Sequence, residues 1–303
     1  MWLNGGCMRV LLSLAFLLSL GSPRAEAFLQ QQGEEVAARL TARFDDVRAD
    51  CGSPSRPAFL CSGVIIRATE YSGNFDFWNP SPGSKYRGGV SFSYLRSGSV
   101  FVKGMPGLVK DFIAMPPMAG AVVSPFKYVC VFPVDAATDL RSDRGCGMVN
   151  GDLSSRYCSS QGIVSAEQYV GKYYADMWSG FNPKHKQCSF DVREGSPNSA
   201  NSFYQNLKAI AGVNYLDPHC DENEMVAMTW SDNIPSQLPI EALFYFNRSG
   251  RDNSLAVSYA QYDQRRFKAE TGKFLPIISL RLPNHYSGRA TFMYFTSDQA
   301  ITE

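Results

Sequence analysis

The chain has 303 residues, of which 45% are hydrophobic and 19% are charged, and its formal net charge is +1. This composition excludes an intrinsically disordered chain, because it provides enough apolar surface to form a sizeable core. The small net charge also argues against a general affinity for nucleic acid or for anionic membranes.

The first 27 residues have the features of a signal peptide. Arg9 precedes the apolar run "VLLSLAFLLSL" over residues 10–20, and "AEA" at residues 25–27 is typical of a cleavage site. The apolar run is too short to span a bilayer comfortably. We therefore expect export to an extracellular or periplasmic location. The mature chain, residues 28–303, should form a single domain without a membrane span.

The mature chain mixes helix and strand patterns without the regular strand–helix–strand rhythm of a parallel sheet. The spacing of apolar residues and a capping box at Ser165 and Gln168 define the elements. In chain order we expect a helix over residues 32–49, strands over 62–69 and 90–96, a hairpin partner over 99–104, a strand over 126–134, helices over 165–180 and 199–211, strands over 225–230, 239–246 and 256–262, a short helix over 263–272 and a strand over 274–282. This order predicts an α+β fold with a mainly antiparallel sheet.

The cysteines after residue 27 indicate a disulfide-rich region, since thiols oxidise in exported proteins. Short spacing first suggests the pair Cys51–Cys61, and the next pairs proposed are Cys146–Cys158 and Cys130–Cys188, which leaves Cys220 over. Spacing alone does not determine connectivity, because six cysteines allow 15 arrangements. The histidines are scattered and C-x-x-C is absent from the sequence, so no metal site is predicted.

Single polar residues on the predicted strands are the candidate site residues. Arg67 lies near the end of "VIIRAT", Ser91 and Ser93 alternate on "VSFSYLR", and Glu241 opens "IEALFYF". Each has an ordinary structural explanation as well. Arg67 could be a solvated strand end, the serines could face outward, and Glu241 could be a charge at the sheet rim.

Several segments resemble the halovibrins, which are secreted bacterial proteins described as NAD-consuming enzymes of the ADP-ribosyltransferase/NAD-glycohydrolase type. The resemblance covers roughly residues 45–283, and its segments are "CGSPSRPAFLCSGVIIRAT", "FWNPSP", "GGVSFSYLR", "DAATDLRSDRGCG", "QCSFDVR", "IPSQLPIEALFYF" and "TGKFLPIISLRLP". It implies a split sheet like that of the ADP-ribosyltransferase fold, with a disulfide-rich insert. It also implies NAD as substrate without a further cofactor, and a host protein or an immunity protein as partner.

The arginine–serine–glutamate branch of that superfamily has an Arg at the end of one strand, a Ser-x-Ser on another and a Glu on a third. The resemblance assigns these roles to Arg67 as a pyrophosphate clamp, to Ser91 with Ser93 as ribose supports, and to Glu241 as the carboxylate that faces an oxocarbenium-like centre. Among the residues of the aromatic loop, Phe77 or Trp78 could stack on the nicotinamide ring, or could simply pack in the core.

The residue two positions before Glu241 indicates whether water or a protein side chain accepts the ADP-ribose group. Transferases that modify arginine or asparagine usually carry Glu or Gln at that place, whereas this chain has Pro239. Because proline has no polar side chain, hydrolysis is favoured over protein ADP-ribosylation. On this interpretation, Glu241→Gln abolishes NAD cleavage and leaves thermal stability nearly unchanged.

Two other functions remain open on the sequence. A non-enzymatic, disulfide-stapled binding protein, such as an adhesin or inhibitor, would use the aromatic residues and the Gly- and Pro-rich loops for contact. A secreted hydrolase would need His219 or His285 as a base, although neither has an evident nucleophile partner in the sequence. His185 and Cys188 could form a His/Cys pair, and the alternative is a surface histidine beside a structural disulfide.

Overall fold

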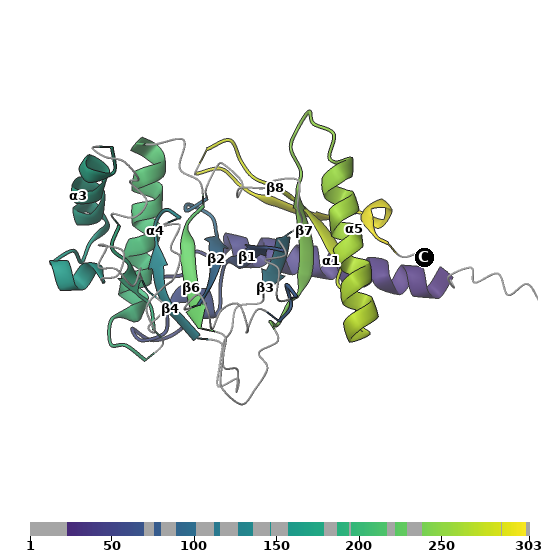
Figure 1. The fold of residues 1–303 in the computed structure, drawn as a ribbon, viewed down its shortest axis with the longest axis horizontal. Coiled ribbons are helices and arrows are strands. Elements are labelled where there is room, and N and C mark those ends of the chain that lie inside the picture. The colour runs from purple at the N-terminus through teal and green to yellow at the C-terminus, as the bar shows by residue number, and fades with distance from the viewer. Residues whose placement is uncertain are drawn as a thin grey trace, which may run out of the picture.

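In the computed structural model of the chain, the residues described are 23–69, 76–79, 89–100, 112–115, 127–135, 146, 157–178, 187–193, 195–216, 222–228, 238–285 and 287–300. Strands of these stretches form one sheet in the order β5-β4-β6-β2-β1-β3-β7-β8-β9 (Figure 1). Their bounds are β1 Val64–Ala68, β2 Val90–Leu95, β3 Phe112–Met115, β4 Lys127–Phe132, β5 Phe190–Asp191, β6 Glu224–Met228, β7 Ala242–Phe246, β8 Ile277–Arg281 and β9 Thr291–Tyr294.

The sheet is mixed. Its neighbouring strands run antiparallel except for β7 and β8, which are parallel. Parallel neighbours need a crossover connection, and helix α5 (Ser254–Thr271) provides it. The expected α+β class is therefore confirmed.

The two faces of the sheet are buried in separate cores, because successive side chains of a strand point to opposite faces. Ile65 of β1 belongs to one core, together with residues of α3 (Ala166–Trp178), α4 (Ser199–Leu216) and α5. We call this side of the sheet the α4/α5 face. Val64 and Ile66 belong to the second core, which α1 (Pro23–Asp45) covers on the opposite face (Figure 1).

Helix α1 packs through an apolar stripe. Val36, Leu40 and Phe44 recur at a spacing of four residues and are buried, which is the pattern that predicts a helix over residues 32–49. The helix starts nine residues earlier and ends four residues earlier than predicted. Its first turn, residues 23–27, overlaps the end of the predicted signal peptide, and residues 1–22 lie outside the described stretches.

The C-terminal elements include one wrong prediction. Residues 256–262 were predicted as a strand, but they belong to α5, which also contains the residues predicted as a short helix. Ala256, Ala260, Gln264 and Phe267 are buried at helical spacing, and this stripe becomes visible only when the two predicted segments are read together. The expected hairpin partner over residues 99–104 lies mostly outside the described residues.

The capping box of the second predicted helix is confirmed. The Gln168 backbone N–H donates to Ser165 Oγ at 3.2 Å, and the Ser165 N–H donates to the Gln168 side chain at 3.1 Å. These two bonds satisfy donors that the first turn of α3 would otherwise leave without partners. The helix predicted over residues 199–211 is also present, as α4, and continues to Leu216.

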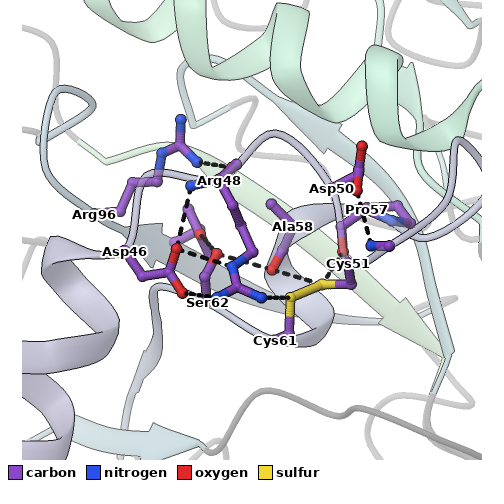
Figure 2. Close-up of a disulfide and its surroundings, with 11 residues drawn as sticks. Asp46, Arg48, Asp50, Cys51, Pro57, Ala58, Cys61, Ser62 and Arg96 are labelled. Carbon is purple, nitrogen blue, oxygen red and sulfur yellow. Dashed lines mark hydrogen bonds and ion pairs between the residues drawn. A yellow bond between two sulfur atoms is a disulfide. The ribbon is translucent and has the colours of Figure 1, made fainter.

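Three disulfides are present, and they use the six cysteines that were expected to pair. Cys51–Cys61 is confirmed (Figure 2). The other two predicted pairs are wrong, because Cys130 bonds Cys146 and Cys158 bonds Cys188. Cys130 lies on β4 beside β5, and the fold rather than the sequence spacing determines which sulfur is nearest. Cys220 lies outside the described residues.

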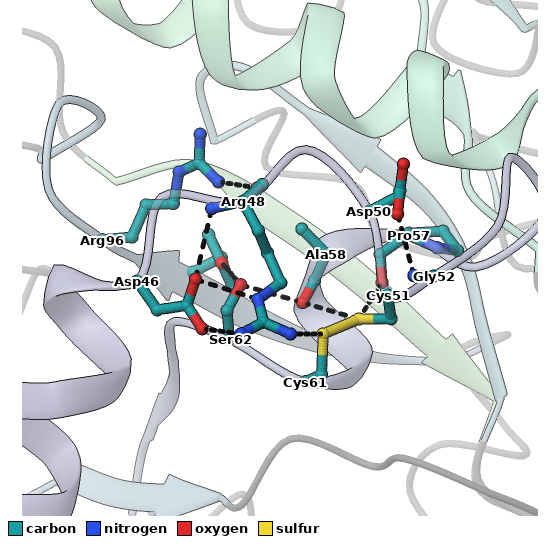
Figure 3. Close-up of polar contacts among 11 residues, drawn as sticks. Asp46, Arg48, Asp50, Cys51, Gly52, Pro57, Ala58, Cys61, Ser62 and Arg96 are labelled. Atoms are coloured by element: carbon teal, nitrogen blue, oxygen red, sulfur yellow. Dashed lines mark hydrogen bonds and ion pairs between the residues drawn. A yellow bond between two sulfur atoms is a disulfide. The ribbon is translucent and has the colours of Figure 1, made fainter.

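The loop between α1 and β1 is held by polar contacts around the first disulfide. Arg48 pairs with Asp46 at 2.7 Å and also donates to Cys61 Sγ at 3.6 Å (Figure 3). Arg96, directly after β2, donates to the Arg48 carbonyl at 2.6 Å. This network fixes the start of β1 against the end of β2, and so sets the register of the two strands that carry candidate site residues.

Within the described stretches, no helix combines the length and the apolar character needed to cross a bilayer.

Candidate active site

Two neighbouring strands, β1 and β2, carry three of the candidate residues. Arg67 lies near the end of β1, and Ser91 and Ser93 lie on β2, which pairs with β1 along one edge and with β6 along the other. Ser93 lies opposite Ile66 of β1 in the antiparallel register. The structure therefore brings Arg67 and the Ser-x-Ser segment onto adjacent strands.

A carboxylate that the sequence analysis does not single out lies beside Ser91. Ser91 Oγ donates a hydrogen bond to Glu224 Oε1 at 2.5 Å. Glu224 is the first residue of β6, and its side chain is buried, with 3% of the residue exposed. A buried carboxylate is costly unless hydrogen bonds stabilise it, so the bond from Ser91 is a structurally important contact.

The residues before Glu224 are held in place by the edge of β2. The Asn223 side chain accepts from the Tyr94 N–H at 2.8 Å and donates to the Tyr94 carbonyl at 2.7 Å. The Glu222 carbonyl accepts from the Asp135 N–H at 2.6 Å, and the Glu222 residue is itself buried. The segment Glu222-Asn223-Glu224 therefore has a fixed backbone and two buried carboxylic side chains.

The polar groups are divided between the two faces of the sheet. Ser91 and Ser93 alternate with Phe92 and Tyr94, which belong to the core of the α4/α5 face, so the serines point to the opposite face. Arg67 lies two residues after Ile65 on β1, so the two side chains point to the same face. The Arg67 guanidinium lies 6.0 Å from the Phe92 ring, on the α4/α5 face. Arg67 thus reaches the serine side only around the end of β1.

Glu241 lies at the start of β7, two strands away from β1. It directly precedes β7, and its N–H donates to the Ala114 carbonyl of β3 at 2.9 Å. The register aligns Ser93, Ile66, Ala114 and Ala242 in a row across four strands. With neighbouring strands about 4.8 Å apart, the backbone of Glu241 lies about 14 Å from the Ser-x-Ser segment.

The Glu241 carboxylate is bound by α1. Arg43 Nη1 contacts Oε2 at 2.5 Å, and Arg39 Nε pairs with Oε1. The two arginines are four residues apart and so share one side of the helix. The Glu241 side chain is 9% exposed, compared with 20% for Arg43 and 47% for Arg39. These ion pairs fasten α1 to the start of β7.

Glu241 also lines a cavity of about 520 Å³ together with Trp78. Further walls come from Phe28 and Gln32 of α1, from Phe267 of α5 and from Lys273. The cavity combines a carboxylate, an amine and aromatic surface. Its lining, as far as the described residues define it, contains neither Arg67 nor the two serines.

Both aromatic candidates pack against other aromatic rings, and Trp78 in addition lines the cavity beside Glu241. Phe77 and Trp78 are buried and meet edge-to-face at 4.8 Å between ring centroids. Trp78 also contacts Phe267 at 5.6 Å, and the Arg266 guanidinium lies 5.0 Å from its ring centroid. These contacts correspond to the core-packing alternative for both residues.

The candidates of the hydrolase alternative are not assembled into a site within the described stretches. Cys188 is consumed by its disulfide with Cys158, and His285 lies in an exposed turn where Nδ1 is 2.9 Å from Ser287 Oγ. His185 and His219 lie outside the described residues. Among the described residues, no three His, Cys, Asp or Glu side chains form a group that could hold a metal ion.

The sequence also contains a local signal for Glu224. "ENE" at residues 222–224 places two acidic residues, one residue apart, directly before a predicted strand. An apolar run follows Glu241, and another follows Glu224. Only the pairing of β6 with β2 distinguishes the two residues.

Comparison with known proteins gives no identification. No model of a known protein family matches the sequence, and no curated protein gives a significant match.

Proposed function

We propose that the protein cleaves the nicotinamide–ribose bond of NAD, with Glu224 in the role that the sequence suggested for Glu241. The observation that carries the proposal is the 2.5 Å hydrogen bond from Ser91 to Glu224 on neighbouring strands. Arg67 on the third adjacent strand supports it, because the superfamily pattern requires Arg, Ser-x-Ser and Glu on three strands.

The chemistry matches these residue types. Loss of nicotinamide leaves an oxocarbenium-like centre on the ribose, and a carboxylate stabilises that positive charge. The hydroxyl of Ser91 holds the Glu224 carboxylate in one orientation, which lowers the reorganisation needed in the transition state. Arg67 has the planar, permanently charged group that suits a pyrophosphate, provided that the substrate passes over the end of β1.

The choice of acceptor changes with the choice of carboxylate. The residue two positions before Glu224 is Glu222, whereas Pro239 stands two positions before Glu241. A Glu at this place matches the pattern of transferases that modify arginine or asparagine, and its carboxylate can orient a guanidinium or an amide. We therefore favour transfer to an acceptor side chain, with hydrolysis as the reaction in the absence of an acceptor.

The strand arrangement and the disulfides also support the proposed fold family and export. The three adjacent strands are compatible with the split sheet of the ADP-ribosyltransferase fold and with a halovibrin-like protein. The three disulfides fit an oxidising compartment and hence export by the predicted signal peptide. On this proposal, NAD is the substrate and a host protein is the acceptor, or an immunity protein binds the enzyme.

The test is release of nicotinamide from NAD by the purified protein, with and without agmatine as a small guanidinium acceptor. Glu224→Gln should lower kcat/KM by about 100-fold or more, the effect of removing one preorganised electrostatic group. Glu222→Gln should keep hydrolysis but lose transfer to agmatine. Glu241→Gln is the matched control and should retain both activities. Full activity in Glu224→Gln would refute the assignment.

One observation favours the non-enzymatic alternative. Arg67 and the serine–glutamate pair lie on opposite faces of the sheet, so a single ligand reaches both only around the strand end. A disulfide-stapled binding protein would need no such convergence. If the folded wild-type protein releases no nicotinamide from NAD, this alternative replaces the enzymatic proposal.

A further inference from the structure

A second cavity, of about 470 Å³, lies where β7 and β8 end. Its walls are the end of β7 with the segment that follows, residues 246–249, the end of β8 with the segment that follows, residues 281–284, Arg289 shortly before β9, and Thr291 at the start of β9. β7 and β8 are the parallel pair of the sheet, and α5 connects them. The carboxyl ends of parallel strands are a common place for ligand binding, because the connecting segments diverge there and leave a crevice.

The charge of this cavity is positive. Arg248, Arg281 and Arg289 line it, and its lining contains no aspartate or glutamate. Arg289 is paired with Asp45 of α1. The guanidinium groups of Arg248 and Arg281 have no ion pair within the described part of the chain. Two cations without a counter-charge thus border the same cavity.

The surroundings of Arg248 show that its charge is poorly compensated. Partial burial lowers the pKa of Arg248 from its usual value, and the nearby positive charge of Arg251 lowers it further. Both effects disfavour the cation in the protein alone, and a bound anion would reverse them. The guanidinium still remains charged at neutral pH because arginine titrates far above that range.

The loop that carries Arg248 is held in place before any ligand binds. The Arg248 N–H donates to Asn253 Oδ1 at 3.2 Å, and Asn253 donates to Asn247 Oδ1 at 3.3 Å. Asn247 in turn donates to Ser279 Oγ of β8 at 3.1 Å. This chain of hydrogen bonds ties the loop to the neighbouring strand, so little ordering entropy is lost when the cavity binds a ligand.

We propose that this cavity binds a phosphorylated small molecule, with Arg248 and Arg281 holding the phosphate group. Arginine forks suit phosphate oxygens, and the amide of Asn284 and the hydroxyls of Ser249 and Thr291 provide further hydrogen-bonding groups. The volume exceeds that of a single phosphate and falls within the range of small-molecule sites. Phe246 and Pro283 provide apolar surface for the rest of the ligand.

The site is separate from the proposed NAD-cleaving residues. Its lining contains none of Arg67, Ser91 and Glu224, and β3 lies between β1 and β7 in the sheet. The proposal therefore does not depend on the enzymatic one. The two proposals fail independently, because NAD cleavage is measured as release of nicotinamide, whereas the second site is measured by the dependence of pyrophosphate binding on Arg248 and Arg281.

The experiment is isothermal titration of the full chain with inorganic pyrophosphate at constant ionic strength, with sodium chloride as the balancing salt. The wild type should bind with a Kd below about 1 mM. The double variant Arg248→Gln/Arg281→Gln should bind at least about 10-fold more weakly, since it loses two charge-assisted contacts. Arg251→Gln removes the same kind of charge from a neighbouring residue outside the lining, and should change Kd by less than about twofold.

Three results would overturn the proposal. The first is a wild-type Kd above about 1 mM. The second is unchanged binding in the double variant. The third is equal weakening in Arg251→Gln, which would indicate a general positive field and no defined site. Arg281 is exposed, so Arg281→Gln alone should fold normally and should still weaken binding measurably if the double variant proves unstable.

Discussion

Replacing Glu241 by glutamine tests whether this residue is structural or catalytic. The structure predicts a loss of stability, because glutamine removes the charge that pairs with Arg39 and Arg43 of α1. Breaking a fully buried ion pair costs about 3–5 kcal/mol, whereas an exposed pair contributes about 0–1 kcal/mol. The Arg43 pair is mostly buried and the Arg39 pair is half exposed, so we expect the free energy of unfolding to decrease by about 2 kcal/mol.

The measurement is urea denaturation followed by tryptophan fluorescence, with a double-mutant cycle. Arg43→Gln should cost somewhat less than Glu241→Gln, because Arg39 keeps its pair with Glu241, and the double variant should cost at least about 1 kcal/mol less than the sum of the two. A loss below about 0.5 kcal/mol in Glu241→Gln would refute the inference that these pairs fasten α1 to the sheet.

The same variants separate stability from catalysis. Arg43→Gln weakens the α1 contact but keeps the Glu241 carboxylate, whereas Glu241→Gln removes it. If Glu224 is the catalytic carboxylate, both variants should retain NAD cleavage at a temperature at which they are folded. If only Glu241→Gln loses activity, the carboxylate of Glu241 is required after all, and the role of Glu224 must be abandoned.

Two further predictions concern the fold. Gly63→Ala should lower the free energy of unfolding by about 3 kcal/mol or more, because φ is +70° and a Cβ would lie 2.1 Å from the Tyr94 ring. Gly98→Ala is the control: its φ is +77° but the space around it is open, so it should cost only about 1 kcal/mol. Equal losses in thermal unfolding would contradict this. Burial raises the pKa of Tyr245 to about 12, and its hydroxyl donates to Asp298 at 2.7 Å. In the unfolded chain a tyrosine titrates near pH 10, so stability should fall as the pH rises from about 10 to about 12, and Tyr245→Phe should show a shallower fall; equal slopes would oppose this assignment.

Local sequence signals predicted features that depend on residues close together in the chain. The capping box at Ser165 and Gln168 is such a signal, and it is present in the structure. The prediction of a strand over residues 256–262 was wrong because a short window with aromatic and β-branched residues fits more than one period. The stripe from Ala256 to Phe267 identifies a helix only over the longer window.

Contacts between distant segments were much harder to predict. The pairings of Cys130 with Cys146 and of Cys158 with Cys188 depend on where β4 and β5 meet, and the separation of cysteines along the chain does not contain that information. The same holds for Arg39 and Arg43. Both lie in the helix predicted over residues 32–49, but no local pattern indicates that they contact a carboxylate about 200 residues away.

The candidate site shows how this limit affects a functional argument. Glu224 and Glu241 both precede apolar strands, and sequence offers no physical reason to prefer the one that pairs with β2. With Glu241 as the catalytic carboxylate, Pro239 stands at the acceptor-orienting position and water is the favoured acceptor. With Glu224 in that role, as we propose from the pairing of β6 with β2, the acceptor-orienting residue is Glu222, which is buried and whose carbonyl accepts from the Asp135 N–H. A single strand pairing thus changes the expected reaction from hydrolysis to transfer, and the Glu222→Gln assay with agmatine measures that difference directly.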